Sequence, residues 1–167
     1  MEKLWSPWRS QYIDSIKEKN DSDECIFCSI SKQSVDDPKN LLIDKGELTF
    51  TVLNLYPYNN GHLMVVPYRH TKDFSLLTKE ENIEIMQKLQ LAEKSLKMVF
   101  KPEGFNIGAN LGKVSGAGID EHVHFHIVPR WNGDTNFMPV LGEVKIISQD
   151  LYDTKKKLFE TYKQLLK

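Results

Sequence analysis

Apolar residues recur along the chain in two different periods, which predict strands in some segments and helices in others. Short apolar runs bounded by turn residues predict strands within residues 41–55, 62–67 and 104–112, and the first segment holds two strands around a Lys45-Gly46 turn. A long helix is expected to begin after Thr78, because Thr78 and Glu81 have the spacing of a capping box. Its inner face, running to about Phe100, carries Ile85, Leu89, Ala92, Leu96 and Val99.

A second helix is expected near the C-terminus, with Leu151, Leu158, Tyr162 and Leu165 on its inner face. Strands joined by turns, with separate helices, predict an α+β fold: an antiparallel sheet of about five strands, a long helix and a C-terminal helix. Residues 143–148 offer a further strand.

The length of 167 residues favours a single domain over residues 1–167. We expect an N-terminal extension at 1–24, a core at 25–131, and a tail and helix at 132–167. The extension contains Trp5, Trp8 and Tyr12, which are too apolar for a free tail and are expected to pack on the core or on a partner subunit.

Composition and charge exclude several classes of protein. Hydrophobic residues make up 40% of the chain, enough for a core, and the net charge of −1 argues against a nucleic-acid binder that works through bulk charge. The sequence holds no run of 18 apolar residues, so we expect no membrane span. Its first residues lack the apolar region of a signal peptide, and we expect a cytoplasmic protein.

The two cysteines, Cys25 and Cys28, form a Cys-x-x-Cys pair. In a reducing compartment such a pair is more typical of a metal site or a redox site than of a disulfide. A thioredoxin-like site fits poorly, because the preceding segment KEKNDSDE is polar rather than a strand. Two thiolates are half of a zinc site and need two further ligands, and two unligated cysteines are the alternative.

Three of the five histidines occupy alternate positions: His122, His124 and His126. In a strand they would lie on one face, about 6.6 Å apart at neighbouring positions, in a row about 13 Å long, which is the scale of a short polyphosphate. Crowded imidazoles repel one another when protonated, so they should be mostly neutral. The plain alternative is an ordinary half-exposed face of a sheet. The glycine-rich loop at 112–118, just before them, is either a phosphate cradle or a surface loop.

The segment His122-Val123-His124-Phe125-His126-Ile127-Val128 resembles the signature of the histidine triad (HIT) family, in which histidines alternate with apolar residues. The segment NLYPYNNGHLMVVPYRH is similar to the strand, turn and strand that precede the long helix in that family, and the resemblance covers most of the chain from Cys25 to Trp131. The segments LWSPWRSQYI, AGIDEHVHFHIVPRW and GDTNFM resemble a bacterial branch of the family that is like diadenosine tetraphosphate phosphorylase.

The resemblance implies an enzyme that hydrolyses or transfers at the α-phosphate of a dinucleoside polyphosphate or related nucleotide, through a nucleotidyl-histidine. It implies that His124 is the nucleophile, that His126 binds the phosphate and that His62 supports them. Nucleotide-binding positions would be Asn54, Asn110, Gly112, Gly116 and Gly118. Inorganic phosphate would be the second substrate of a phosphorylase.

The resemblance also implies a closed structural zinc site of Cys25, Cys28, His70 and His122, no organic cofactor, and a homodimer. One departure is the pair Asp120 and Glu121, which stands where many relatives carry Gln, Ser or Thr and would repel a polyphosphate unless both side chains point away. The alternatives are an adenosine phosphoramidate hydrolase of the same family, a metal-activated hydrolase and a non-catalytic nucleotide-binding module.

Overall fold

The computed structural model describes residues 24–134, 147 and 149–167. The packing expected for Trp5, Trp8 and Tyr12 therefore lies outside the described residues, as does nearly all of the strand expected at 143–148.

Five strands form one antiparallel sheet in the order β1-β2-β3-β5-β4. Their bounds are Leu42–Lys45 for β1, Thr49–Leu53 for β2, Leu63–Pro67 for β3, Gly104–Gly108 for β4 and Phe125–Arg130 for β5. The α-helices are α2 (Ile26–Ser31), α3 (Lys79–Phe100) and α5 (Leu151–Leu165), and two short 3-10 helices are η1 (Phe74–Leu76) and η2 (Lys113–Ser115). The predicted α+β fold, with five strands, a long helix and a C-terminal helix, is confirmed.

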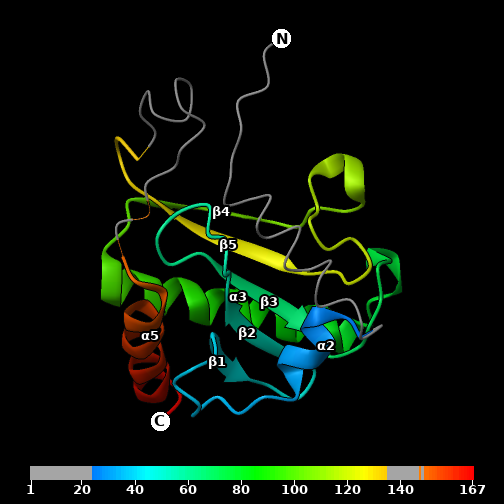
Figure 1. Cartoon of the computed structure of the whole chain (residues 1–167), viewed down its shortest axis with the longest axis horizontal. Helices are drawn as coiled ribbons and strands as arrows, with labels where there is room; N and C mark the ends of the chain where they lie inside the picture. The colour runs from blue at the N-terminus through cyan, green and yellow to red at the C-terminus, as the bar shows by residue number, and fades with distance from the viewer. Residues whose placement is uncertain (1–23, 135–146, 148) are drawn as a thin grey trace.

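Helices α3 and α5 pack together and cover one face of the sheet, so that α3 runs behind the strands in Figure 1. The capping box of Thr78 and Glu81 is formed in both directions, as predicted. The predicted inner face of α3 is confirmed, since its first four members are buried and the fifth, Val99, is partly buried. On α5, Leu158 and Tyr162 are fully buried. No helix of the described residues is long and apolar enough to cross a membrane.

Polar side chains also hold the helices to the sheet. The Glu84 carboxylate accepts hydrogen bonds from the backbone N–H groups of Leu48 and Thr49 and from the Thr49 hydroxyl. Lys88 of the same helix forms an ion pair with Asp44 of β1, and both side chains are largely buried. Because these contacts lie on one side of α3, they fix the hairpin of β1 and β2 against that helix.

The opposite face of the sheet carries a second apolar cluster, and helix α2 lies over it (Figure 1). Phe27 of α2 is buried among side chains of β1, β2 and β3, which are Leu42, Phe50, Val52, Met64 and Val66. This helix was not predicted from the sequence, because six residues are too few for a helical period to stand out.

The predicted strand of histidines begins later than expected. The structure starts β5 at Phe125, so only His126 lies within the strand. Pairing with β3 ends at Phe125, opposite Val65, and the Val123 N–H donates to the Thr71 carbonyl at 2.7 Å instead. The predicted division of the faces is nevertheless confirmed. Val123 and Ile127 lie in the cluster beneath the helices, and the histidines lie on the other face.

Candidate functional site

The three histidines at the start of β5 and His62 at the start of β3 form a buried cluster. The exposed fractions are 0% for His62, 1% for His122, 5% for His124 and 7% for His126, which excludes the alternative of an ordinary half-exposed strand face. Ring centroids lie 4.8 Å apart for His124 and His126 and 5.0 Å apart for His62 and His126. The rings are therefore closer than the spacing of alternate residues in a strand, because the side chains converge.

Hydrogen bonds determine which nitrogen of His62 and of His126 carries the proton. The Tyr58 backbone N–H donates to His62 Nδ1 at 3.0 Å, so this nitrogen is an acceptor. A neutral His62 then carries its proton on Nε2, which donates to His126 Nδ1 at 2.9 Å. His126 in turn must carry its own proton on Nε2. The backbone turn before β3 thus sets the tautomer of a histidine in β5.

The N–H at Nε2 of His126 is a buried donor without a hydrogen-bond partner among the described residues. His126 lines a pocket beside the cluster, so this donor is available to a ligand. Burial, together with the nearby His124, lowers the pKa of His126 to about 4. The ring therefore stays neutral near pH 7 and offers one directed hydrogen bond.

His124 has the opposite arrangement of donor and acceptor toward the pocket. Its Nδ1 lies 2.9 Å from the carbonyl oxygen of His122, and a carbonyl can only accept, so Nδ1 carries the proton. The lone pair of Nε2 is then free for a nucleophilic attack or for a metal. Burial lowers the pKa of His124, which keeps this lone pair unprotonated near neutral pH. His124 and His126 thus present one lone pair and one N–H to the same pocket.

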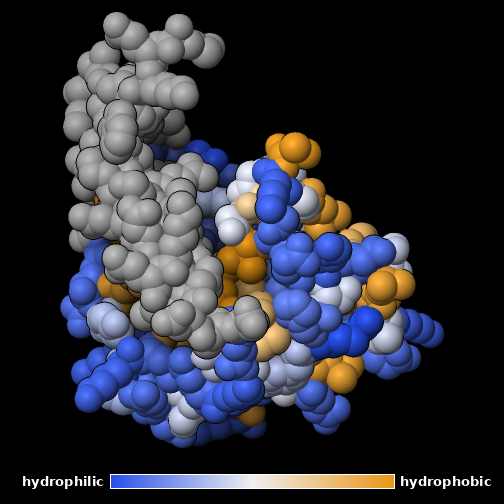
Figure 2. All heavy atoms as spheres, turned by 45° about the vertical axis from the view of Figure 1, so that its right-hand side comes forward, coloured by the Kyte–Doolittle hydropathy of each residue, from blue (hydrophilic) through white to orange (hydrophobic). Residues whose placement is uncertain are grey.

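The pocket has a volume of about 400 Å³, which is within the usual range for a small-molecule site. One part of its lining is apolar and consists of Phe27, Met64 and Ile119. The Phe27 ring also lies 4.9 Å from the His124 ring, so one wall of the pocket contacts the candidate nucleophile directly. Figure 2 shows a mostly hydrophilic surface in which apolar atoms are visible within a recess near the middle of the view.

Most of the predicted nucleotide-binding positions meet at this pocket. Asn54, Asn110, Gly116 and Gly118 line it, whereas Gly112 does not. His62 lies behind His126 and is outside the lining. Five lining residues were not predicted from the sequence: Phe27, Tyr56, Tyr58, Met64 and Ile119. The only signal for the tyrosines was their place in the turn just before His62.

A second cluster brings together Cys25, Cys28, His70 and His122. Their four candidate ligand atoms all lie within 4.8 Å of one another. His122 Nδ1 is 3.3 Å from Cys25 Sγ and 3.8 Å from Cys28 Sγ, and His70 Nδ1 is 3.4 Å from Cys28 Sγ. Tetrahedral zinc would hold sulfur and nitrogen ligands about 3.6 Å apart, by its usual bond lengths. The four residues therefore fit a metal of this size.

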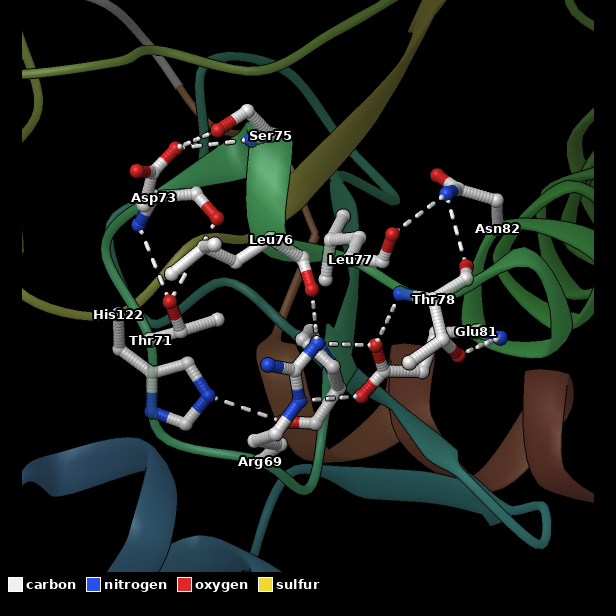
Figure 3. Close-up of polar contacts among 11 residues, drawn as sticks. Arg69, Thr71, Asp73, Ser75, Leu76, Leu77, Thr78, Glu81, Asn82 and His122 are labelled. Carbon is white, nitrogen blue, oxygen red and sulfur yellow. Dashed lines mark hydrogen bonds and ion pairs between the residues drawn. The ribbon is translucent and has the colours of Figure 1, made fainter.

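Neighbouring groups orient the two imidazoles of this cluster, as Figure 3 shows for His122. His122 Nε2 donates to the Pro67 carbonyl at 2.9 Å, which leaves Nδ1 with its lone pair toward the thiols. The segment that carries His70 is fixed by Arg69, whose guanidinium donates to the Glu81 carboxylate and to the Leu76 carbonyl. Such outer contacts are typical of metal sites.

The chemistry of the thiols also favours a cation in this position. Burial raises the pKa of the Cys28 thiol, and the adjacent Cys25 raises it further. The Cys28 thiol therefore resists ionisation, and a bound cation would remove that resistance. The donor set of two sulfurs and two imidazole nitrogens can hold a metal ion.

The two acidic residues before the histidines each face a lysine. Glu121 lies 3.3 Å from the Lys72 ammonium, and Asp120 lies 3.9 Å from the Lys113 ammonium. Neither acid lines the pocket. The concern that two carboxylates would repel an anionic ligand is thereby reduced.

Residues 36–133, which are more than half of the chain, match the family model described as HIT domain. The chain is 42% identical over 163 residues to AP-4-A phosphorylase of Mycobacterium tuberculosis, covering 95% of this chain and 83% of that protein. It is 33% identical over 108 residues to the adenosine 5′-monophosphoramidase of Schizosaccharomyces pombe, covering 65% of this chain and 75% of that protein.

Among solved structures, the fold is similar to that of a Zn-bound histidine triad family protein from Mycobacterium smegmatis. The TM-score is 0.68 at 26% identity, covering 85% of this chain and 95% of that chain. The three alternating histidines, the sheet that holds them and these matches show that the chain belongs to the HIT domain family.

Proposed function

We propose that this protein is a phosphorylase that converts diadenosine tetraphosphate and inorganic phosphate into ADP and ATP. The observation that carries the proposal is the pairing of a free lone pair on His124 with a free N–H on His126 at one pocket. Membership of the HIT family supports the wider class, a nucleotide hydrolase or phosphorylase. The similarity to AP-4-A phosphorylase over nearly the whole chain supports this substrate.

The reaction would proceed by two displacements at one phosphorus. The lone pair of His124 Nε2 attacks the α-phosphorus of one adenosine, the bond to the bridging oxygen breaks, and ATP leaves with that electron pair. An AMP group is then bonded to His124. An oxygen of inorganic phosphate attacks the same phosphorus, the phosphorus–nitrogen bond returns its electron pair to His124, and ADP leaves.

The surrounding side chains suit the parts of this substrate. A neutral imidazole avoids the repulsion that an anionic nucleophile would meet at a phosphodiester anion. The N–H of His126 donates to a phosphate oxygen, which stabilises charge that develops in the transition state. We assign the adenine to the apolar lining around Phe27 and Met64. Asn54 and Asn110 are the polar partners for the ribose or the phosphates.

Two alternatives are weakened by the geometry. A hydrolase with a catalytic metal on His124 and His126 would need lone pairs on both Nε2 atoms, but the His62 contact leaves the proton of His126 on Nε2. A binding module without turnover would have no need of a directed lone pair on His124. The adenosine phosphoramidate hydrolase stays the second candidate, because a relative with that activity is 33% identical.

We further propose that residues 1–167 form one domain and that the Cys25, Cys28, His70 and His122 cluster holds a structural zinc ion. Four protein ligands leave no open position on zinc, so the metal would hold together α2, the turn after β3 and the chain entering β5. No organic cofactor is needed for either displacement step.

The first prediction concerns the reaction and its nucleophile. With diadenosine tetraphosphate, products identified by mass should be ADP and ATP, formed only when phosphate is added, whereas AMP and ATP would indicate hydrolysis. The His124→Ala variant should lose several orders of magnitude in rate and still bind nucleotide, because only the covalent step is removed. His126→Ala should lose less.

Acid-labile label on the protein provides the direct check on the nucleophile. After mixing with α-labelled nucleotide, wild-type protein should carry label and His124→Ala should carry none. Label that persists in the variant, or turnover within about tenfold of wild type, would falsify the assignment.

The second prediction concerns the proton on His126. Because burial lowers its pKa to about 4, its nitrogen resonances should keep neutral positions from about pH 7 to about pH 5 and move only near pH 4. The pKa of His126 in the folded protein lies below its value of about 6.5 in the unfolded chain, so the unfolded chain binds the proton first. The free energy of unfolding therefore decreases as the pH falls from about 6.5 to about 4. Spectra of protein labelled with ¹⁵N-histidine, assigned with His126→Asn, measure this. A midpoint above about pH 6 contradicts it.

The third prediction concerns the metal. Freshly purified protein should contain about one equivalent of zinc by elemental analysis, and Cys28→Ser should lower the content because one of four ligands is lost. The control is Ser29→Ala, which alters an exposed neighbour of Cys28 in the same helix. Wild-type protein with less than about a tenth of an equivalent would count against a zinc site.

The fourth prediction concerns assembly. We propose a homodimer in which the outer edge of β4 and the adjacent surface of α3 meet a second copy, since β4 is a terminal strand of the sheet and Ile107 is exposed on it. Light scattering should give twice the chain mass of 19.4 kDa, and Ile107→Glu should shift the protein toward monomer. A monomer at micromolar concentration would rule out this assembly.

A further inference from the structure

The pocket that would take a tetraphosphate contains no charged side chain among the described residues that line it. Its polar lining consists of asparagines, tyrosines, backbone groups and two imidazoles. A polyphosphate carries several negative charges, and transferring them from water into such a site is costly without a compensating cation. A cationic side chain beside the pocket would supply such a charge.

Lys113 lies on the loop that forms one side of this pocket. It is the first residue of η2, and Gly116 and Gly118, just after η2, both line the pocket. The Lys113 ammonium is 3.9 Å from the Asp120 carboxylate, and Asp120 directly follows Ile119, another lining residue. The side chain of Lys113 is 82% exposed and that of Asp120 is 24% exposed, so the ion pair is loose and solvated.

The backbone of the loop turns sharply between Lys113 and Gly116, which lines the pocket. Gly112 and Gly116 flank η2 with φ angles of 81° and 90°, which side chains other than glycine rarely adopt. The Ser115 hydroxyl donates to the Gly112 carbonyl at 2.6 Å and tightens the turn. Figure 1 shows this turn projecting beside the end of β5 at which the histidines lie. A lysine here has a flexible four-carbon stem with which to reach a ligand.

We propose that Lys113 binds the phosphate oxygens beyond the bond that is broken, and that Asp120 holds its ammonium beside the pocket until a ligand arrives. The inference rests on the proposed function, because it takes the α-phosphate to lie at His124. The leaving polyphosphate departs on the side opposite His124, and inorganic phosphate enters from that same side. One lysine thus serves both displacement steps.

Kinetics with paired substrates test this role. In Lys113→Met, KM should rise roughly tenfold for diadenosine tetraphosphate and for inorganic phosphate, because a charge-assisted hydrogen bond to each is lost. Hydrolysis of adenosine 5′-phosphoramidate, whose leaving group has no further phosphate, should keep its kcat and KM. Lys113→Arg should restore both phosphate KM values. Asp120→Asn should lower KM for the tetraphosphate, since the competing carboxylate is gone.

The matched control is Lys163→Met, which removes another exposed lysine at 3.7 Å from a carboxylate, that of Asp36. It lies on α5, on the other side of the molecule from η2 (Figure 1), and should leave all constants unchanged. KM values within about twofold of wild type in Lys113→Met would overturn the proposal. So would a rise in KM for Asp120→Asn equal to that of Lys113→Met, because the pair would then act as a structural unit.

A binding measurement separates this inference from the proposed function. In the His124→Ala background, calorimetry should show that Lys113→Met weakens ATP binding and leaves AMP binding unchanged. If wild-type protein fails to form ADP and ATP, the proposed phosphorylase activity is rejected. The ratio of ATP affinity to AMP affinity still tests the role of Lys113 in that case. An unchanged ratio of ATP to AMP affinity would reject Lys113 whatever the reaction is.

Discussion

The position of His122 is the constraint on which the site depends, because three of its groups have different tasks. Its Nδ1 faces two thiols, its Nε2 donates to the Pro67 carbonyl, and its own carbonyl accepts a hydrogen bond from His124 Nδ1. A rotation of this residue would disturb the cluster of cysteines and histidines and the tautomer of His124 together. The two sites are thus parts of one arrangement, although their ligand atoms differ.

A second constraint is that the imidazoles next to the pocket must stay neutral. Burial lowers the pKa values of His122, His124 and His126, which disfavours their charged forms. Neutral histidines have one donor and one acceptor each, so a chain of hydrogen bonds can assign every proton. The chain starts at a backbone N–H of Tyr58, which cannot change its role. This fixed start gives the pocket a defined lone pair and a defined N–H before any ligand binds.

The sequence predicted those elements whose pattern is local. Period and capping identified α3 because 22 residues repeat the same apolar spacing, and the alternation of His122, His124 and His126 identified their shared face. The resemblance to the HIT family brought Cys25, Cys28, His70 and His122 together, and the structure places them in one cluster.

Other features depend on long-range contacts and had no sequence pattern. The late start of β5 goes with its pairing to β3, which ends at Val65 and Phe125 although β3 itself continues to Pro67, and Val123 bonds instead to the carbonyl of Thr71. The wall formed by Phe27, Met64 and Ile119 draws on three segments far apart in the chain. Apolar residues such as these are indistinguishable in sequence from ordinary core residues. The pairing of Lys113 with Asp120 required the loop to fold back on itself.

Phe27 lies between Cys25 and Cys28, so the two-residue spacer of this motif affects both the cysteine pair and the pocket. The spacer between two metal-binding cysteines is usually explained by the sulfur-to-sulfur distance that one metal ion requires. Here the same two residues also deliver an aromatic ring to the wall of the pocket and against His124. Lengthening the spacer by one residue would rotate that ring by about 100° around α2, by the geometry of 3.6 residues per turn. The length of the spacer therefore bears on the wall of the pocket as well as on the cluster of cysteines and histidines.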